Sequence, residues 1–324
     1  TLQGAVDAAP AGATICVEPG TYAEDVTVDK TLTLQGRTAP RGGDPATVDG
    51  SFSLEPAADG TTVRRLRITS SETFPGGTFP DPFAVRVKAS DVVVESNVIE
   101  GFSADLSDGA GSFTVHGVQV FGAGGADVSN VTVRDNVIRG FESAGVPGEW
   151  PKYGGIAAVK VQAGVDGATV RGNRIVDHHS AGWVWGVVLA TSGSAPGVPE
   201  DVVVEENHVE GLNDGSVYDV FAGADGGRNA APFPGSAFGI DGDAEADEAT
   251  VRRNNLLAPN GAESKDQDDG LVAECNWWGD RSGPTDDGNA SGTGTWAVER
   301  GTASIDYTPW LNAPAPSRAC VGGR

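Results

Sequence analysis

The sequence predicts an all-β protein whose short strands stack as the coils of a parallel β-helix, a solenoid. Its 324 residues include 47 Gly and 19 Pro, and only 7% are aromatic, which favours short strands joined by turns. A pattern of valine, two mostly polar residues, asparagine, any residue and an aliphatic residue also recurs, at 94–99, 133–138, 170–175, 204–209 and 251–256. A recurring unit that cannot bury its own apolar face is expected to stack on its neighbours.

Each repeat combines this pattern with a second short strand. The intervals between successive asparagines are 39, 37, 34 and 47 residues, too long for a hairpin. Each interval, and the stretch before Asn97, contains one further run with the alternation of a strand, at 84–87, 117–120, 158–161, 186–189 and 239–242. We therefore expect two strands in each coil, with neighbouring coils about 4.8 Å apart.

The asparagines of the repeat are expected to form a structural ladder at one corner of the coils. They are Asn97, Asn136, Asn173, Asn207 and Asn254, and Leu66 holds the same position one coil earlier. The apolar residues on either side would form two inward columns. Each amide would bond to the amide of the next coil and to the turn backbone. Asparagine also tolerates the left-handed backbone conformation that such a corner needs.

Segments at both ends resemble the right-handed parallel β-helix (pectate-lyase-like) superfamily, in particular its secreted or surface-attached members. Residues 13–36 contain an apolar strand, a PGTY turn, E-x-V-x-V and K-x-LTLxG. Residues 275–284, CNWWGDRSGP, and 305–311, IDYTPWL, resemble a closing segment of such proteins. The resemblance implies an N-terminal cap at 1–12, a parallel β-helix at 13–275 and a C-terminal closing segment at 276–324.

Both ends of such a rod need covering, because an open coil exposes unpaired backbone groups and core side chains. A short N-terminal helix would present one apolar face to the first coil through Leu2, Ala5, Val6 and Ala9. Four tryptophans would either seal the far end or offer platforms for sugar rings: Trp277, Trp278, Trp296 and Trp310.

The formal net charge is −23, with 22 Lys and Arg against 45 Asp and Glu. This balance argues against nucleic acid as a partner, because phosphate binding needs a basic surface, and it disfavours an anionic membrane surface. No apolar run approaches the roughly 20 residues of a membrane span. The acidic, lysine-poor composition fits a salt-adapted protein or an ordinary acidic secreted one.

Three cysteines leave one unpaired. We expect a disulfide between Cys275 and Cys320 that holds the C-terminal tail, and a buried free thiol at Cys16. The sequence has no CxxC motif and no cluster of cysteine and histidine, so a zinc site is not expected. Asn130 and Asn289 begin glycosylation sequons, which fits a glycoprotein that is extracellular or on the cell surface.

The second strands would carry an outward column formed by Arg86, Gln119, Lys160, Val188 and Asp241. In the polysaccharide lyases that the chain resembles, a basic residue on such a face removes a proton beside a sugar carboxylate, which other cations or calcium neutralise. The resemblance thus implies Arg86, His116 and Lys160 as candidate catalytic residues. Stacking would put Arg86 and Lys160 about 10 Å apart. The alternative is a strand face that is charged only for solubility.

Calcium is the one cofactor that the sequence suggests. Four alternating carboxylates would lie on one side of a strand: Asp241, Asp243, Glu245 and Asp247. A second acidic stretch is DQDD at 266–269. The alternative for both is a hydrated acidic loop. Aromatic and histidine residues at 178–185 could in turn contact carbohydrate or pack beneath a loop.

Two functions remain. The first is an extracellular or cell-surface structural β-helix, a stalk, adhesin or self-assembling filament subunit that joins head to tail and contacts carbohydrate. The second is a polysaccharide lyase or related enzyme that acts on an acidic polysaccharide. The regular ladder and the two caps favour the first function, and the residues Arg86, His116 and Lys160 favour the second. The fold alone does not decide between them.

Overall fold

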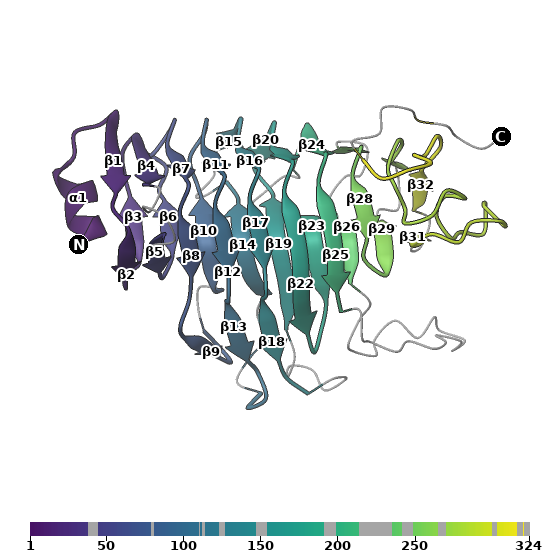
Figure 1. Cartoon of the computed structure of the whole chain (residues 1–324), viewed down its shortest axis with the longest axis horizontal. Helices are drawn as coiled ribbons and strands as arrows, with labels where there is room; N and C mark the ends of the chain where they lie inside the picture. Colours follow the sequence, from purple (N-terminus) through teal and green to yellow (C-terminus); the bar gives the residue numbers. More distant parts are fainter. Residues whose placement is uncertain are drawn as a thin grey trace.

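The computed structural model shows a rod of stacked coils (Figure 1). The residues described are 1–37, 45–78, 81–109, 111, 114–122, 127–146, 154–190, 199–213, 235–241, 249–264, 270–299, 303–315 and 320, with backbone only at 240 and 241. The pairings between strands in this part of the chain are parallel. The predicted all-β parallel β-helix is therefore confirmed.

Each complete coil contributes a strand to each of three sheets. Sheet A comprises β1 (Ala13–Val17), β4 (Leu32–Gly36), β7 (Thr62–Arg64), β11 (Val93–Glu95), β16 (Thr132–Arg134), β21 (Thr169–Arg171), β24 (Val202–Glu205), β27 (Ala249–Arg252), β30 (Gly270–Val272) and β32 (Ser304–Asp306). Sheet B comprises β2 (Gly20–Tyr22), β5 (Ala46–Asp49), β8 (Arg67–Thr69), β12 (Val98–Glu100), β17 (Val137–Arg139), β22 (Arg174–Ser180), β25 (His208–Leu212) and β28 (Asn255–Leu257).

Sheet C comprises β3 (Val26–Val28), β6 (Phe52–Leu54), β10 (Phe83–Val87), β14 (Thr114–Val120), β19 (Gly155–Gln162), β23 (Val184–Ala190), β26 (Ser236–Asp241), β29 (Asn260–Ser264) and β31 (Trp296–Glu299). A two-stranded sheet pairs β15 (Val128–Ser129) with β20 (Val165–Asp166). The prediction of two strands in each coil was wrong, because the asparagine corner divides the repeat motif into one strand of sheet A and one of sheet B.

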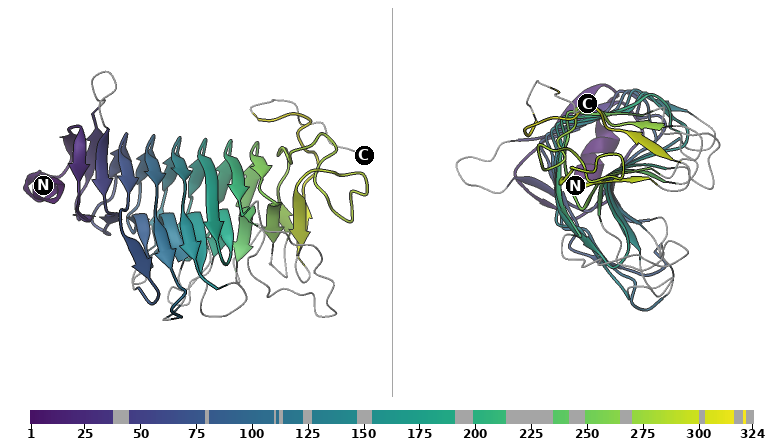
Figure 2. Two further views of the ribbon diagram at one scale, coloured as in Figure 1. Left: turned by 60° about the horizontal axis from the view of Figure 1, so that its bottom comes forward. Right: turned by 90° about the vertical axis from the view of Figure 1, so that its right-hand side faces the viewer.

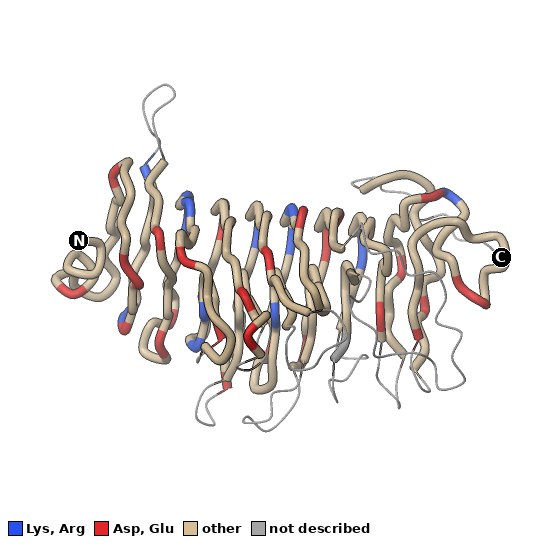
Figure 3. Tube along the Cα trace, turned by 90° about the horizontal axis from the view of Figure 1, so that it is seen from below, with Lys and Arg blue, Asp and Glu red and all other residues tan. Residues whose placement is uncertain are grey.

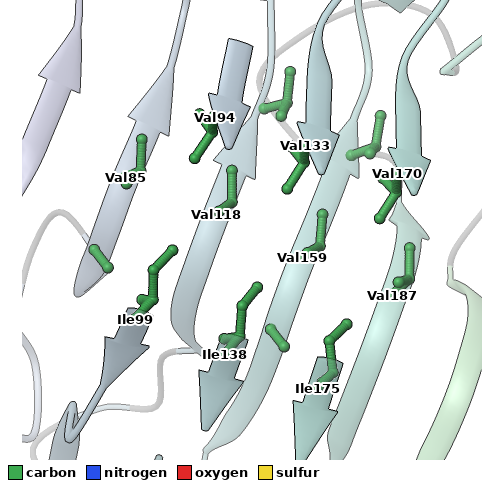
Figure 4. Close-up of a cluster of buried hydrophobic side chains, with 14 of the residues drawn as sticks. Val85, Val94, Ile99, Val118, Val133, Ile138, Val159, Val170, Ile175 and Val187 are labelled. Carbon is green, nitrogen blue, oxygen red and sulfur yellow. The ribbon is translucent and has the colours of Figure 1, made fainter. Parts of the chain in front are cut away.

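The apolar residues of the motif form two inward columns. Val94, Val133 and Val170 are in register in sheet A, and their side chains are buried. Ile99, Ile138 and Ile175 are equally in register in sheet B. Figure 4 shows both columns meeting the valines of sheet C inside the rod. Each fully buried Val or Ile side chain contributes roughly 1.5–3 kcal/mol, so this core stabilises every coil.

The left-handed backbone at the corner does not fall on the asparagine, contrary to the prediction. The residue before it adopts this conformation, with φ of 56° at Ser96, 55° at Asp135, 64° at Gly172 and 58° at Glu206. The corner turns at that residue, and the asparagine follows with its side chain buried. A non-glycine residue in this conformation costs roughly 1–2 kcal/mol, which the bonds of the asparagine offset.

A lobe extends the cross-section of the rod from the third coil onward (Figures 1 and 2). One wall consists of β9 (Thr73–Pro75), β13 (Ser103–Asp105), β18 (Glu142–Ala144) and the end of β22. Phe102 and Phe141 are buried there with ring centroids 5.4 Å apart. His178 is also buried, and its Nδ1 accepts the backbone N–H of Phe141 at 3.2 Å. His178 is thus part of the lobe interior.

Both ends of the rod carry covering segments. Helix α1 (Leu2–Ala8) buries Leu2 and Val6 on the first coil, whereas Ala5 of the predicted apolar face is exposed. At the other end Trp278 and Trp310 are buried. Trp277 is half-buried and forms an isolated parallel β-bridge with Asn255. Trp296 is 55% exposed and therefore does not seal the end. The segment 276–324 contributes β31 and β32 to sheets C and A.

Two of the cysteines are joined and the third faces outward. A disulfide links Cys275 and Cys320, whose Cα atoms are 5.2 Å apart. Cys16 is exposed, so the prediction of a buried thiol was wrong. The alternation of β1 turns Val17 toward the core and Cys16 toward solvent.

Candidate functional site

The outer face of sheet C carries the predicted column in part. Arg86 pairs with Gln119, and Gln119 pairs with Lys160. Lys160 then pairs with Val188, and Val188 with Gly239. Asp241 lies two residues further along and pairs with Ala190. Its predicted place in the Arg86 column was therefore wrong.

Arg86 is held by neighbours on its own and the next coil. Its side chain is only 7% exposed, and its guanidinium carbon lies 3.8 Å from the centroid of the Phe83 ring. Nε donates to Gln119 Oε1 at 2.8 Å, and Nη2 donates to the carbonyl of Asp81 at 3.0 Å. Gln119 in turn donates to Gln162 Oε1 at 2.6 Å. These bonds make Arg86 part of a buried polar chain.

Burial lowers the pKa of Arg86 to about 10, although the carboxylates of Asp81 and Glu55 oppose this effect. The guanidinium therefore stays charged at neutral pH. Glu55 also forms an ion pair with Lys88 at 2.8 Å. Burial raises the pKa of Glu55. The hydrogen bonds from Lys88 and Ser53 lower this pKa by more than burial raises it, so the net pKa lies below its usual value.

His116 is fully buried at the edge of the lobe, where it pairs with Phe83 and Ala157. Its Nε2 lies 3.5 Å from Asp81 Oδ2. Burial lowers the pKa of His116 to about 4, with Asp81 opposing and Lys160 and Arg86 reinforcing this shift. The imidazole is therefore neutral at pH 7, and it has no contact with solvent.

Asp81 remains ionised near the imidazole. Burial raises its pKa, but the contact with His116, the backbone N–H of Thr114 and the charge of Lys160 lower it by more, and the net pKa lies below the usual value. Its side chain is 39% exposed. An ionised carboxylate can accept hydrogen bonds but cannot donate a proton as a general acid.

A cleft of about 490 Å³, the step cleft, opens where the lobe begins. In the first two coils the chain passes directly from sheet B to sheet C, whereas in the third it detours through β9. The views in Figures 1 and 2 show this change in outline. The cleft is lined by residues 23–27, 49–51, 53, 70–72, 74, 78, 81–83 and 102.

Aromatic rings and acidic groups share the step cleft. Phe74 and Phe83 are half-buried in it. Asp25 Oδ1 accepts the backbone N–H and the hydroxyl of Ser51, both at 2.8 Å. Asp49 accepts from Ser71 in the same way, at 2.7 Å for each bond. These bonds fix two pairs of an aspartate and a serine in the lining of the cleft.

Charge in the step cleft has one sign. The carboxylate residues that line it are Glu24, Asp25, Asp49, Glu72 and Asp81, and its described lining includes no Lys or Arg. Glu24 accepts from the backbone N–H groups of Leu2 and Gln3 at 2.6 and 2.9 Å, and so fixes helix α1 to the wall of the cleft. The cleft therefore suits a neutral ligand better than an anionic one.

The aromatic pair at 183–185 covers the outer face of sheet C beyond Lys160. Trp185 is 9% exposed and packs with Ala157 and Val188, while the half-buried Trp183 lies against that cluster. A Cβ at Gly155 would meet the indole of Trp183 at 1.8 Å. Only a glycine there admits the ring, so this pair packs on the sheet.

The candidate calcium ligands lie largely outside the described residues. Asp243, Glu245 and Asp247 belong to 242–248, and the second acidic stretch to 265–269. Asp241 is described by its backbone alone, at the end of β26. The described part of the chain contains no group of three His, Cys, Asp or Glu residues that could hold a metal ion.

The two sequons differ in their surroundings. Asn130 is exposed and its Nδ2 donates to Asp91 Oδ1 at 3.2 Å. Asn289 is half-buried, and its Nδ2 donates to the carbonyls of Ser282 and Pro284 at 2.8 and 2.9 Å. A glycan on Asn289 would displace one of these bonds, so Asn130 is the better acceptor.

The sequence reasoning missed one rung of the ladder, Asn276. Its Oδ1 accepts from the backbone and the side chain of Asn254 at 2.9 and 3.0 Å. The segment 273–278, AECNWW, fits the motif with Ala273 at the valine position and Trp278 at the aliphatic one, and both are buried. A search that allowed any apolar residue at these positions would have found it.

Comparison with known proteins supplies no functional argument. No protein-family model and no curated protein matches the sequence. The catalytic domain of a GH87 alpha-1,3-glucanase in complex with tetrasaccharides matches with a TM-score of 0.33 and 11% identity, over 92% of this chain and 63% of that one. A PL6 family polysaccharide lyase from Pseudopedobacter saltans matches with a TM-score of 0.28 and 14% identity, over 99% and 96% of the two chains. In the described residues no helix is long and apolar enough to cross a membrane.

Proposed function

We propose that this protein is a carbohydrate-contacting β-helix rod of the cell exterior, which binds a neutral glycan in the step cleft. The observation that carries the proposal is a cleft whose lining combines the half-buried rings of Phe74 and Phe83 with hydroxyl and carboxylate groups that hydrogen bonds fix in place. Sugars are recognised by apolar contact with aromatic rings and by hydrogen bonds to their hydroxyls. The disulfide supports an oxidising location.

The charge of the cleft favours a neutral glycan over an acidic polysaccharide. A uronate unit placed among the five carboxylates of the lining would meet like charges. The guanidinium of Arg86 lies against the lining residue Phe83, but the protein already engages it. Arg86 is bonded to Gln119 and stacked on Phe83.

The same geometry disfavours lyase chemistry at Arg86, His116 and Lys160. A carboxylate clamp must present free N–H groups to the substrate, whereas two nitrogens of Arg86 already donate to protein oxygens. A general base must reach the proton that it removes, and His116 is fully buried. Lys160 alone is half-buried on this face. We therefore favour binding without cleavage.

Substitution Phe74→Ala tests the proposal. Titration with neutral oligosaccharides should show binding by the unaltered protein and roughly fivefold weaker binding by the variant, since one ring contact is worth about 1 kcal/mol. Trp296→Ala, an exposed aromatic residue at the far end, serves as the control and should leave affinity unchanged. Equal affinity in all three proteins would refute the cleft as the site.

A parallel assay addresses the lyase alternative. Cleavage of a uronate polymer by β-elimination gives unsaturated products that absorb in the near ultraviolet. Absorbance that grows with enzyme concentration and is lost in Lys160→Ala would replace the binding proposal with the enzyme. Absence of such products together with glycan binding would support the rod.

The role of the rod as stalk, adhesin or filament subunit is a proposal about assembly. Helix α1 covers the first coil, and Trp278 and Trp310 cover the last. Copies that join head to tail would therefore meet through these covering segments. Negative-stain electron microscopy with and without calcium tests this head-to-tail assembly. Ordered fibres would support a filament, and isolated short rods would contradict it.

A further inference from the structure

A second cleft, of about 590 Å³, lies on the outer surface where sheet A turns into sheet B. Four arginines line it: Arg37, Arg65, Arg67 and Arg139. The one carboxylate in the lining described is Glu100. We call this cleft the arginine groove. An excess of positive charge is unusual on a chain with a net charge of −23, in which acidic positions occur along the whole rod (Figure 3).

The stacking of three coils builds the centre of the groove. Glu100 of β12 pairs with Arg139 of β17 on one side and with Thr69 of β8 on the other, and Arg67 lies two residues before Thr69. Its Oε1 is 2.5 Å from Nε of Arg67, and its Oε2 is 2.6 Å from Nε of Arg139. Glu100 is only 13% exposed at its side chain, whereas the two arginines are 45% and 52% exposed. The carboxylate thus orients both guanidinium groups from below.

The outer nitrogens of these arginines stay available. Both ion pairs use Nε, and the terminal NH₂ groups of Arg67 and Arg139 bond to none of the residues that the structure describes. A guanidinium whose Nε is fixed still presents a rigid pair of donors, which matches the oxygens of a carboxylate or sulfate. The carboxylate of Glu100 therefore holds the guanidinium groups of Arg67 and Arg139 in positions from which both can bind an external anion.

Arg65 and Arg37 extend the positive surface to the neighbouring coil. Arg65 is exposed at the left-handed corner before Leu66, with φ of 56°, and no ion pair joins it to another described residue. Arg37 lies 3.2 Å from Glu18, but both side chains are more than half exposed. Solvent and salt screen such a pair, so Arg37 can exchange Glu18 for a ligand.

We propose that the arginine groove binds an anionic polysaccharide that carries sulfate or carboxylate groups. From Arg37 on the second coil to Arg139 on the fifth, the guanidinium groups extend over about 14 Å at the spacing of parallel strands. That length exceeds a single small anion and suits several consecutive sugar units. The net charge of the chain repels a densely charged nucleic acid more strongly than a sparsely charged glycan.

This site is independent of the step cleft. The groove lies where sheet A turns into sheet B, whereas the step cleft is lined by the far end of sheet B, by sheet C and by the lobe. The two linings share no residue. Binding of an anionic polymer in the groove would therefore survive Phe74→Ala, and failure of one proposal leaves the other standing.

The experiment compares dextran sulfate with dextran, which have the same backbone and differ in their sulfate groups, and adds polygalacturonate as the carboxylated polymer. The unaltered protein should bind both anionic polymers in the groove whether or not dextran binds in the step cleft, and only the binding of the anionic polymers should weaken as salt rises. The double variant Arg67→Gln/Arg139→Gln should bind at least tenfold more weakly, since a hydrogen bond to a charged group contributes on this scale.

Two further variants separate recognition from a structural effect. Glu100→Gln leaves one acceptor for the two guanidinium groups, so it should weaken the binding of both anionic polymers while leaving the urea unfolding midpoint close to that of the unaltered protein. Arg281→Gln removes an exposed charge at the far end and should change nothing. The proposal fails if the double variant binds the anionic polymers like the unaltered protein, or if Arg281→Gln causes the same loss. It also fails if the double variant loses dextran binding to the same extent, or if single-stranded DNA binds more tightly than dextran sulfate and polygalacturonate.

Discussion

Substitution Asn136→Ala removes four buried hydrogen bonds from the middle of the asparagine ladder. Its Oδ1 accepts the backbone N–H of Asn97 at 2.9 Å and the Nδ2 of Asn97 at 3.1 Å. Its Nδ2 donates to the carbonyl of Val94 at 2.9 Å and to Asn173 Oδ1 at 3.0 Å. Asn136 and its neighbours in the ladder are 1% exposed, so water cannot replace these partners.

The expected loss of stability follows from these bonds. The backbone N–H of Asn97 loses its partner inside the core, which costs roughly 1–3 kcal/mol, and the three other bonds contribute about 0.5–1.5 kcal/mol each. We therefore expect Asn136→Ala to lower the free energy of unfolding by about 4 kcal/mol. Asn136→Asp keeps an acceptor for Asn97 but loses both donors and buries a charge, so it should be at least as destabilising.

Urea unfolding followed by circular dichroism at pH 7 measures this loss. Asn312→Ala is the matched control, because Asn312 is exposed and its side chain bonds to no other residue that the structure describes. Its effect should stay within about 0.5 kcal/mol. If Asn136→Ala costs no more than this control, the ladder does not stabilise the rod in the way that we describe.

Three further predictions address the lobe, the C-terminal segment and the packing of sheet C. Burial lowers the pKa of His178 to about 3 in the folded protein, so on acidification the unfolded state binds the proton first. The contribution of His178 to stability should therefore be complete above about pH 6.5 and should be lost as the pH falls from there toward 3. Unfolding midpoints at pH 7 and 5 measure this, and an equal fall in His178→Gln would contradict it. Cys320→Ser should lower the stability of the segment held by the disulfide with Cys275 by about 4 kcal/mol for a loop of 45 residues; a melting temperature equal to that of the parent under oxidising conditions would refute it. A Cβ at Gly117 would meet the carbonyl of Ala158 at 2.4 Å, so Gly117→Ala should destabilise by about 1–3 kcal/mol, and an unchanged urea midpoint would show that the coils can separate there.

The sequence was most informative about positions that repeat. Val94, Ile99 and Asn97 recur with the same local spacing in successive coils, and identical neighbours along a stack impose identical environments on each of them. The columns and the ladder positions could therefore be read without knowing the turns. The turn itself was misassigned, because the left-handed conformation falls on Ser96 rather than on Asn97.

Register on sheet C was less predictable. Alternation placed Asp241 in the column of Lys160, but the stack places Gly239 there. Gly239 and Asp241 are two residues apart, so alternation puts both on the same face of the strand. A period of two therefore fits either residue and cannot decide which of them pairs with Val188.

By itself the sequence determined that the chain is a stack of β-coils with an apolar interior, a polar corner ladder and a C-terminal disulfide, because these depend on residue type and local spacing. Only the tertiary structure decided which charges meet. It buried Arg86 beneath Phe83, enclosed His116, and brought Arg67 and Arg139, 72 positions apart by their numbers, to the two oxygens of Glu100. Coulomb interactions and burial depend on distances in space, and loops of different length set those distances coil by coil.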